Sequence, residues 1–301
     1  MTALPPGVIV NADDLGIHPR VNAGILSAYR TGILSSSTML MTTPHVEAAI
    51  RDVVRAAEMP VGIHLSLTAG KPVAPAEQIP DLVDSNGDCR YSASKLLVSG
   101  FSGDSGRRLL AQIRTEFTAQ LALARDLGVT PTHIDSHQHI HMNPAIFKVF
   151  EEVAEKFGID RYRFCREPFP SFALYLNATQ ALLRKNHLKW ALIRWRGSAI
   201  RPRFPTTDYF FGILYSGIMT KQVLLSMLEW LPPQASLEIG IHPGFRVHPG
   251  ELGSSESGFA GFISSPARQE EHDALAAEET AELIRRRGLR LRSFDGALKP
   301  D

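Results

Sequence analysis

The chain has 301 residues, 44% hydrophobic and 21% charged, which is ordinary for a soluble globular enzyme. Its formal net charge of +1 excludes a general electrostatic attraction to nucleic acid. Two cysteines, Cys89 and Cys165, are too few for a disulfide-stapled secreted scaffold, so we expect free thiols in a reducing compartment. We find neither a signal-peptide pattern nor an apolar run of about 18 residues, and we expect a cytoplasmic protein.

Short apolar runs alternate with helical patterns along the chain. The patterns predict strands at 8–10, 61–65, 132–135, 162–165, 237–241 and 289–291, and helices at 21–30, 45–58, 106–127, 144–157, 220–230 and 266–287. This β-then-α order favours a parallel sheet with helices outside it. We expect a single domain over residues 1–301, built as one irregular (βα) barrel, with an open doubly wound sheet as the alternative. No G-x-G-x-x-G follows the first strand, so dinucleotide binding has no support.

Two stretches interrupt this order. Residues 70–106 are rich in Pro, Gly, Ser and Asp, and we expect a long loop over one end of the barrel that is either a functional lid or disordered. Residues 168–207 form a basic, aromatic insertion without Asp or Glu. Its cations are Arg184, Lys185, Lys189, Arg194, Arg196, Arg201 and Arg203, and they alternate with Leu182, Leu183, Leu188, Trp190, Ile193 and Trp195.

Two adjacent carboxylates, Asp13 and Asp14, end the first predicted strand within Asn11-Ala12-Asp13-Asp14-Leu15-Gly16. Ligands bind at the carboxyl ends of strands in barrels and in open α/β sheets. Neighbouring carboxylates repel one another unless a cation or a shared proton relieves the repulsion. The alternative is a helix N-cap, for which one Asp suffices. The pair therefore favours a functional site.

Histidines accompany three further predicted strands. His64 lies in the apolar run Gly62-Ile63-His64-Leu65, and in isolation it is more typical of a packed core residue than of a ligand. His242 stands in an unexceptional His-Pro-Gly turn. Four of the chain's eleven histidines fall within residues 133–141, and they are His133, His137, His139 and His141, with Asp135 in the remaining alternate place. On an extended strand these five residues would face one side, and such a density of imidazole has few structural uses.

In a barrel these strand ends converge at one mouth, so we expect one site. Two histidines and one carboxylate leave positions open for water and substrate, as catalytic metal sites require. A bound ion would acidify a water and polarise a carbonyl oxygen, while the other Asp takes a proton and a histidine protonates the leaving nitrogen. This set suits amide or ester hydrolysis. No G-x-S-x-G elbow is present, which disfavours a serine nucleophile.

The blocks at 11–16, 62–65 and 132–141, with His242-Pro243 as a late histidine block, resemble the signature blocks of the YdjC-like, or ChbG/HpnK, carbohydrate deacetylases. The resemblance implies an irregular (βα) barrel related to the NodB-type polysaccharide deacetylases, with long loop insertions. It also implies a divalent metal ion as cofactor. We expect Mg²⁺ or Zn²⁺, while the donor types also admit Co²⁺, Ni²⁺ or Mn²⁺.

Matched by position, the resemblance implies that Asp14, His64 and His137 are the metal ligands. Asp13 would then be the general base and His242 the candidate general acid, although the division of roles between Asp13 and Asp14 stays open. The remaining members of the histidine block would orient the ligands, and they are Asp135, His139 and His141.

Cys165-Arg166-Glu167-Pro168 and residues 208–217 look closer to the hopanoid-associated HpnK branch, whose proteins are thought to act on N-acetylglucosaminyl hopanoids. Arg166, which ends a predicted strand, is a candidate for orienting Asp13 or binding a substrate oxygen, and the alternative is a salt bridge with Glu167 or another acid. The resemblance thus implies an N-acetylated saccharide or a glycolipid as substrate.

A lipid-linked substrate would bring the enzyme to a bilayer. The insertion at 168–207 has the basic, Trp- and Leu-containing character of a helix on a membrane surface, although an ordinary barrel helix with a basic outer face shows the same pattern. We therefore expect a peripheral membrane contact as one alternative. A homodimer is the default expectation for an oligomer.

Two other functions are weighed against hydrolysis. His133-Ile134-Asp135 also fits the H-x-D of a two-histidine, one-carboxylate iron oxygenase, but those enzymes usually have jelly-roll folds. A non-catalytic sugar-binding protein would have no need of Asp13 beside a metal, so Asp13→Ala would leave its binding intact.

Overall fold

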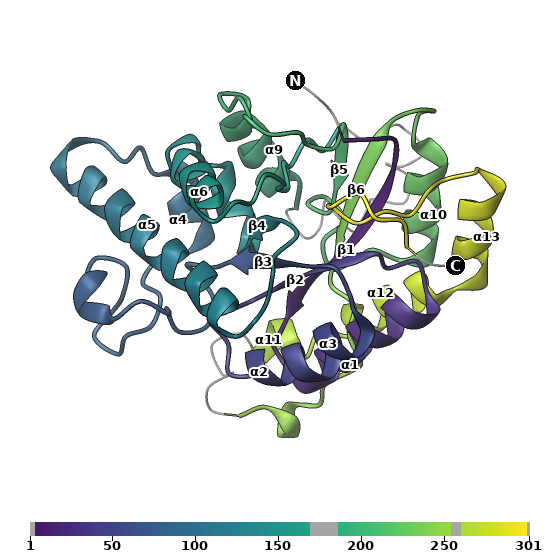
Figure 1. The fold of residues 1–301 in the computed structure, drawn as a ribbon, viewed down its shortest axis with the longest axis horizontal. Helices are drawn as coiled ribbons and strands as arrows, with labels where there is room; N and C mark the ends of the chain where they lie inside the picture. The colour runs from purple at the N-terminus through teal and green to yellow at the C-terminus, as the bar shows by residue number, and fades with distance from the viewer. Residues whose placement is uncertain (1–3, 169–185, 254–259, 300–301) are drawn as a thin grey trace.

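The computed structural model describes residues 4–168, 186–253 and 260–299 (Figure 1). Its strands form one wholly parallel sheet with the order β4-β3-β2-β1-β6-β5. The strands are β1 (Gly7–Leu15), β2 (Ser36–Met39), β3 (Val61–Leu65), β4 (Ile134–Ser136), β5 (Tyr209–Phe211) and β6 (Ser236–Ile241). β1 lies at the centre of the sheet, where every one of its residues is buried. This architecture confirms the predicted parallel α/β fold.

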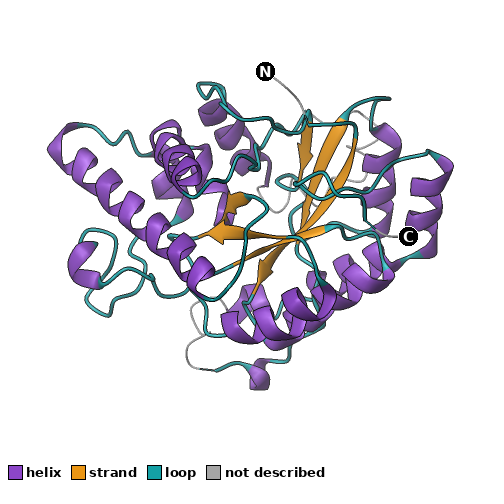
Figure 2. Ribbon diagram, viewed as in Figure 1, coloured by secondary structure: helices purple, strands orange, loops and turns teal. Residues whose placement is uncertain are grey.

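Helices surround the sheet (Figure 2). The α-helices are α1 (Pro19–Thr31), α2 (Val46–Ala49), α3 (Arg55–Ala57), α4 (Ala93–Val98), α5 (Gly103–Asp126), α6 (Pro144–Lys156), α9 (Asn186–Gly197), α10 (Lys221–Trp230), α11 (Ala260–Ile263), α12 (Ala267–Ala276) and α13 (Glu278–Arg286). Shorter or irregular turns are η1 (Ile50–Val54), η2 (Ala76–Gln78), η3 (His137–Met142) and η4 (Pro249–Glu251). Within the described ranges, no helix is both long enough and apolar enough to cross a bilayer.

The sheet curls into a half-barrel whose two edges are bridged by one irregular segment, residues 161–166. On one side, Arg163 N donates to Ile134 O of β4 at 3.1 Å. On the other side, Phe210 N of β5 donates to Arg166 O at 3.1 Å. The predicted strand at 162–165 is therefore reduced to a single bridge at Tyr162, but its position closes the irregular (βα) barrel that we expected.

The segment at 70–106 is more ordered than its composition predicts. It contains η2, α4 and an antiparallel bridge between Val83 and Cys89. The buried carboxylate of Glu116 on α5 accepts hydrogen bonds from Val73 N at 2.9 Å and Ala74 N at 2.8 Å. One buried acceptor thus orders a segment that we expected to be only a long loop, because backbone N–H groups need partners wherever they leave water.

The other differences have local causes. The expected helix at 266–287 is divided into α12 and α13, because Ala277 between them is extended, with ψ at 132°. The histidine block is not extended throughout, because β4 ends at Ser136 and the turn η3 follows it. Both cysteines are free thiols, as expected. Of the basic insertion at 168–207, residues 169–185 lie outside the described residues, and α9 is the helix within the rest.

Candidate active site

A β-bulge in β1 brings two neighbouring carboxylates to the same side of the sheet. Successive side chains of a regular strand point to opposite faces, so Asp13 and Asp14 would otherwise diverge. The pairing of β1 with β2 shifts register between Ala12 and Leu15, and Asp14 has a φ of 70°. This left-handed residue rotates the chain, as bulges beside active sites do. As a result, His64 Nε2 lies 3.9 Å from Asp13 Oδ2 and 3.8 Å from Asp14 Oδ1.

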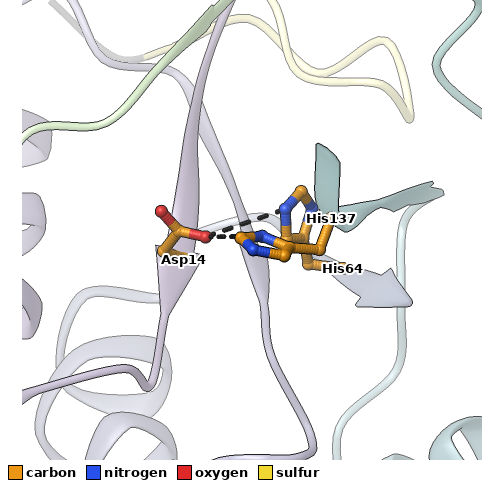
Figure 3. Close-up of side chains that lie close together, drawn as sticks. All are labelled: Asp14, His64 and His137. Atoms are coloured by element: carbon orange, nitrogen blue, oxygen red, sulfur yellow. Dashed lines mark ion pairs between the residues drawn. The ribbon is translucent and has the colours of Figure 1, made fainter. Parts of the chain in front are cut away.

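Three buried side chains from separate parts of the sheet converge on one point. They are Asp14 from β1, His64 from β3 and His137 from the turn after β4, and Figure 3 shows the carboxylate facing both imidazoles. One ligand atom from each lies within 4.8 Å of the other two. His137 Nδ1 is 3.3 Å from Asp14 Oδ1. The structure therefore brings together the three side chains that the family resemblance implied as ligands.

Asp135 fixes the orientation of the His64 ring. Its Oδ1 lies 2.6 Å from His64 Nδ1, while the other ring nitrogen, Nε2, faces the carboxylates of β1. A carboxylate at one nitrogen holds a proton there, and a metal bound at the other nitrogen would displace the proton of that nitrogen. Burial alone would lower the pKa of His64, but the charges of Asp135 and Asp13 outweigh it and raise the pKa to about 9.

The two oxygens of Asp14 have different surroundings. Oδ2 accepts a hydrogen bond from Arg268 Nη2 at 2.9 Å. Oδ1 is buried and faces the imidazoles: His137 Nδ1 lies 3.3 Å away, but no well-formed hydrogen bond reaches this oxygen among the described residues. Burial alone would raise the pKa of Asp14, but His137 and the charge of Arg268 hold it far below its ordinary value.

This arrangement fits a divalent cation. A buried acceptor without a donor carries a desolvation cost of about 1–3 kcal/mol, more when it is charged. A cation between Asp14 Oδ1 and two imidazole nitrogens would remove that cost, and two histidines with one carboxylate is a ligand set of catalytic zinc sites.

Behind the site, the fully buried Arg163 joins three carboxylates. Its guanidinium donates to Asp13 Oδ1 at 2.7 Å and Oδ2 at 2.8 Å. It also lies 2.7 Å from Asp135 Oδ2 and 2.5 Å from Glu238 Oε1. Burial alone would raise the pKa of Asp13, but Arg163 and His64 hold it well below its usual range. Asp13 is therefore ionised at neutral pH and held in one orientation.

Asp13, His64 and Asp135 also place three possible ligand atoms close together. Arg163 already contacts both of these carboxylates, and its positive charge opposes the binding of a cation there. The group that includes Asp14 is the better metal site.

His242 follows β6 and stands at the more open side of the cluster. Its Nε2 is 3.9 Å from Asp13 Oδ2, and its Nδ1 is 3.9 Å from Glu271 Oε2. Its side chain is 17% exposed, against 3% for Asp13. Its backbone N–H donates to Glu271 at 2.6 Å, so α12 holds the residue in place. Burial raises the pKa of Glu271, and the neighbouring His242 counteracts that rise.

Two contacts of Arg166 are described. It lies over the Phe164 ring at 5.4 Å and donates to Thr207 O at 3.4 Å. Both Asp13 oxygens are instead bound by Arg163. The expected alternative partner, Glu167, accepts hydrogen bonds from the backbone N–H groups of residues 212–214.

The histidine block does not share one face. Its strand stops at Ser136, and two consecutive residues, Gln138 and His139, have φ values of 56° and 60°. His141 Nδ1 lies 2.5 Å from Ser136 Oγ, and His139 Nδ1 lies 3.5 Å from Cys165 Sγ. His133 stacks on Phe294 with ring centres 3.7 Å apart. The left-handed turn thus directs His137 to the site and its neighbours into the core.

Three charged residues of the site were missed from the sequence: Arg163, Arg268 and Glu271. Arg163 could have been found, because it is the one charged residue in the apolar run Tyr162-Arg163-Phe164-Cys165. An arginine in a buried strand indicates a buried acidic partner, since an unpaired cation is rarely buried. Arg268 and Glu271 had no such signal, since charges on an amphipathic helix are ordinary.

Comparisons with known proteins agree with this geometry. The family model described as YdjC-like protein matches residues 7–286. A carbohydrate deacetylase of Geobacillus stearothermophilus is 34% identical over 253 residues, which cover 84% of this chain and 85% of that protein. A carbohydrate deacetylase of Mus musculus is 30% identical over 309 residues, covering 96% and 94%.

A solved structure shares the fold. The crystal structure of a putative cellobiose-phosphate cleavage protein from Enterococcus faecalis V583 matches with a TM-score of 0.71 and 24% identity. The match covers 96% of this chain and 97% of that chain. At this identity the likeness supports the irregular barrel and nothing about chemistry.

Proposed function

Because the chain belongs to the YdjC-like family, we propose that it removes the N-acetyl group of an amino sugar by metal-dependent hydrolysis. The observation that carries the proposal is the convergence of the buried Asp14 Oδ1, which has no well-formed hydrogen bond, with the imidazoles of His64 and His137. These three side chains would hold the ion, with Zn²⁺ or Mg²⁺ as the first candidates. The names of the relatives, carbohydrate deacetylases, support the substrate class.

When bound, the ion would polarise the acetamide carbonyl and lower the pKa of a water. Asp13, ionised and fixed by Arg163, would accept a proton from the attacking water. His242, the most exposed of these groups and 3.9 Å from Asp13, would donate a proton to the leaving nitrogen. The products are acetate and a free amine.

The role of Arg163 would be to position the base rather than to touch the substrate. It holds Asp13 in one orientation, because it binds both Asp13 oxygens, while Arg268 binds only Oδ2 of Asp14 and leaves Oδ1 facing the imidazoles. This difference supports Asp13 as the base and Asp14 as the ligand. A contact between Arg166 and a substrate oxygen stays a prediction.

The direct test is acetate release from free N-acetylglucosamine, chitobiose and an N-acetylglucosaminyl lipid, with and without a chelator. We expect release from at least one substrate, loss with chelator, and recovery with Zn²⁺ or Mg²⁺. No acetate from any substrate with any of the divalent ions would overturn the proposal. Sugar binding without turnover that survives Asp13→Ala would favour a non-catalytic sugar-binding protein instead, and the parallel sheet already argues against a jelly-roll iron oxygenase.

We further propose that the substrate is lipid-linked and that α9 meets the bilayer. Leu188 and Trp195, two helical turns apart on α9, are 58% and 64% exposed. Val98, on the neighbouring α4, is 52% exposed. Arg194 is exposed, and Arg196 lies over the Trp195 ring at 5.4 Å. Apolar side chains flanked by arginines suit an interface with anionic lipid.

Sedimentation with vesicles tests this contact. The wild type and Leu298→Ser, which changes a 57% exposed leucine near the C-terminus, should sediment with anionic vesicles. Trp195→Ser should bind them several-fold more weakly. No sedimentation of the wild type with anionic or neutral vesicles would contradict the contact. The cytoplasmic location and the homodimer stay predictions.

A further inference from the structure

One aromatic side chain stands over the candidate metal centre. Phe262, on α11, is 37% exposed, and its ring centre lies 5.9 Å from that of His137 and 5.8 Å from that of His242. Both contacts are edge-to-face, with interplanar angles of 75° and 78°. The ring is therefore next to a proposed metal ligand and to the proposed acid at the same time.

The ring is held there by Arg268. The guanidinium carbon of Arg268 lies 4.4 Å from the Phe262 ring centre, and Arg268 Nε donates to Phe262 O at 3.1 Å. Arg268 is itself only 2% exposed and is bound to Asp14. The buried cation covers part of the ring, and 37% of Phe262 is still exposed beside His137 and His242. The platform is preorganised, because its backbone and its ring are both fixed.

The surroundings define what such a ring can bind. The other groups at the centre are carboxylates and imidazoles, which recognise polar atoms. An aromatic face with a partial negative charge attracts C–H groups, and a pyranose ring presents a face made of C–H bonds beside its hydroxyls. Sites that combine one aromatic surface with a few placed polar groups fix both the position and the orientation of a ligand.

We propose that Phe262 is the stacking platform for the sugar ring that bears the reacting acetamide. The proposal rests on the proposed function, because it assumes that a sugar binds at this metal centre. Phe262 would contact the substrate without taking part in proton transfer. Its removal should therefore weaken sugar binding and raise KM, with a smaller effect on kcat.

The test is the affinity of chitobiose for the Zn²⁺-loaded protein, measured by calorimetry in an Asp13→Asn background so that the sugar is not consumed. Phe262→Ala should weaken binding about tenfold, the size expected for one lost aromatic contact. Phe262→Trp should restore it to within about twofold of the parent, since the larger face still stacks. The matched control is Phe157→Ala. Phe157 also lies beneath a guanidinium, that of Arg125 at 4.8 Å, but it caps the C-terminal end of α6.

A second readout separates stacking from a structural role. Zn²⁺ affinity, measured by competition with a chromophoric chelator, should be unchanged in Phe262→Ala. Equal chitobiose affinity in Phe262→Ala and the parent would overturn the platform. An equal loss of Zn²⁺ and sugar affinity in Phe262→Ala would also overturn it. So would a parent protein that does not bind the sugar. If the wild type releases no acetate but Phe262→Ala still weakens chitobiose binding alone, the platform stands and hydrolysis fails.

Discussion

Replacing Arg163 by Gln should destabilise the protein more than any surface arginine substitution. Arg163 is fully buried, and its guanidinium contacts Asp13, Asp135 and Glu238 at 2.5–2.8 Å. Removing one partner of a buried ion pair costs about 3–5 kcal/mol, because the other charge is left uncompensated. Three carboxylates lose their cation here, so we expect a loss of about 5 kcal/mol in the free energy of unfolding.

The assay is urea unfolding followed by circular dichroism at a temperature where the variant still folds, since about 5 kcal/mol approaches the total stability of many domains. The control is Arg51→Gln, which removes an exposed pair with Asp52 at 2.7 Å and should change the free energy of unfolding far less, because water screens exposed charges. If the Arg163 variant loses no more stability than this control, the account of the buried network is wrong.

Arg163→Lys adds a test of catalysis. A single ammonium keeps the charge but cannot reach three carboxylates, so Asp13 loses part of the interaction that depresses its pKa. The pKa of Asp13 then rises toward its ordinary value, and the base becomes protonated at a higher pH. The acid limb of the kcat/KM profile should shift upward in pH, and an unchanged acid limb would contradict the assignment of Asp13 as the base.

Four further results are expected. His242→Ala should lower kcat by about 10²–10⁴-fold in acetate release while the bound metal, measured by elemental analysis, stays unchanged. Chelation should lower the thermal unfolding midpoint, because an ion present at 100 times its Kd contributes about 2.7 kcal/mol to the native state, and calorimetry with Zn²⁺ restored should recover it. Gly70→Ala should cost at least about 2 kcal/mol in urea unfolding, since its φ is +71° and a Cβ would lie 1.9 Å from Thr42 O. Gly87→Ala, with φ at +75° and nothing within 4 Å, should cost only the backbone strain of about 1 kcal/mol.

The sequence predicted strands that lead to the candidate site because their patterns are local. The strand at 61–65 matches β3 to the residue, and its short apolar run needs no distant partner to be read. β2 was not predicted, because Ser36-Ser37-Thr38 lacks apolar character and becomes a strand only between β1 and β3. Short polar strands depend on tertiary pairing, which local propensity does not contain.

The site was predictable in its residues but not in its arrangement. Adjacent Asp13 and Asp14 indicated a site, yet the bulge that turns both inward depends on a single left-handed residue. The pairing of Asp13 with Arg163 spans 150 residues, and that of Asp14 with Arg268 spans 254. Such contacts form only when the barrel closes, so they cannot be predicted from the spacing of residues along the chain.

The central claim is that one ion, held by Asp14, His64 and His137, is required for deacetylation. The most direct measurement is a titration of the metal-free protein with Zn²⁺, following bound metal and acetate release together. We predict that activity rises in proportion to bound metal and reaches its maximum at one ion per chain, and that His137→Ala loses both. Full acetate release from the metal-free protein, or full activity of His137→Ala, would contradict the claim.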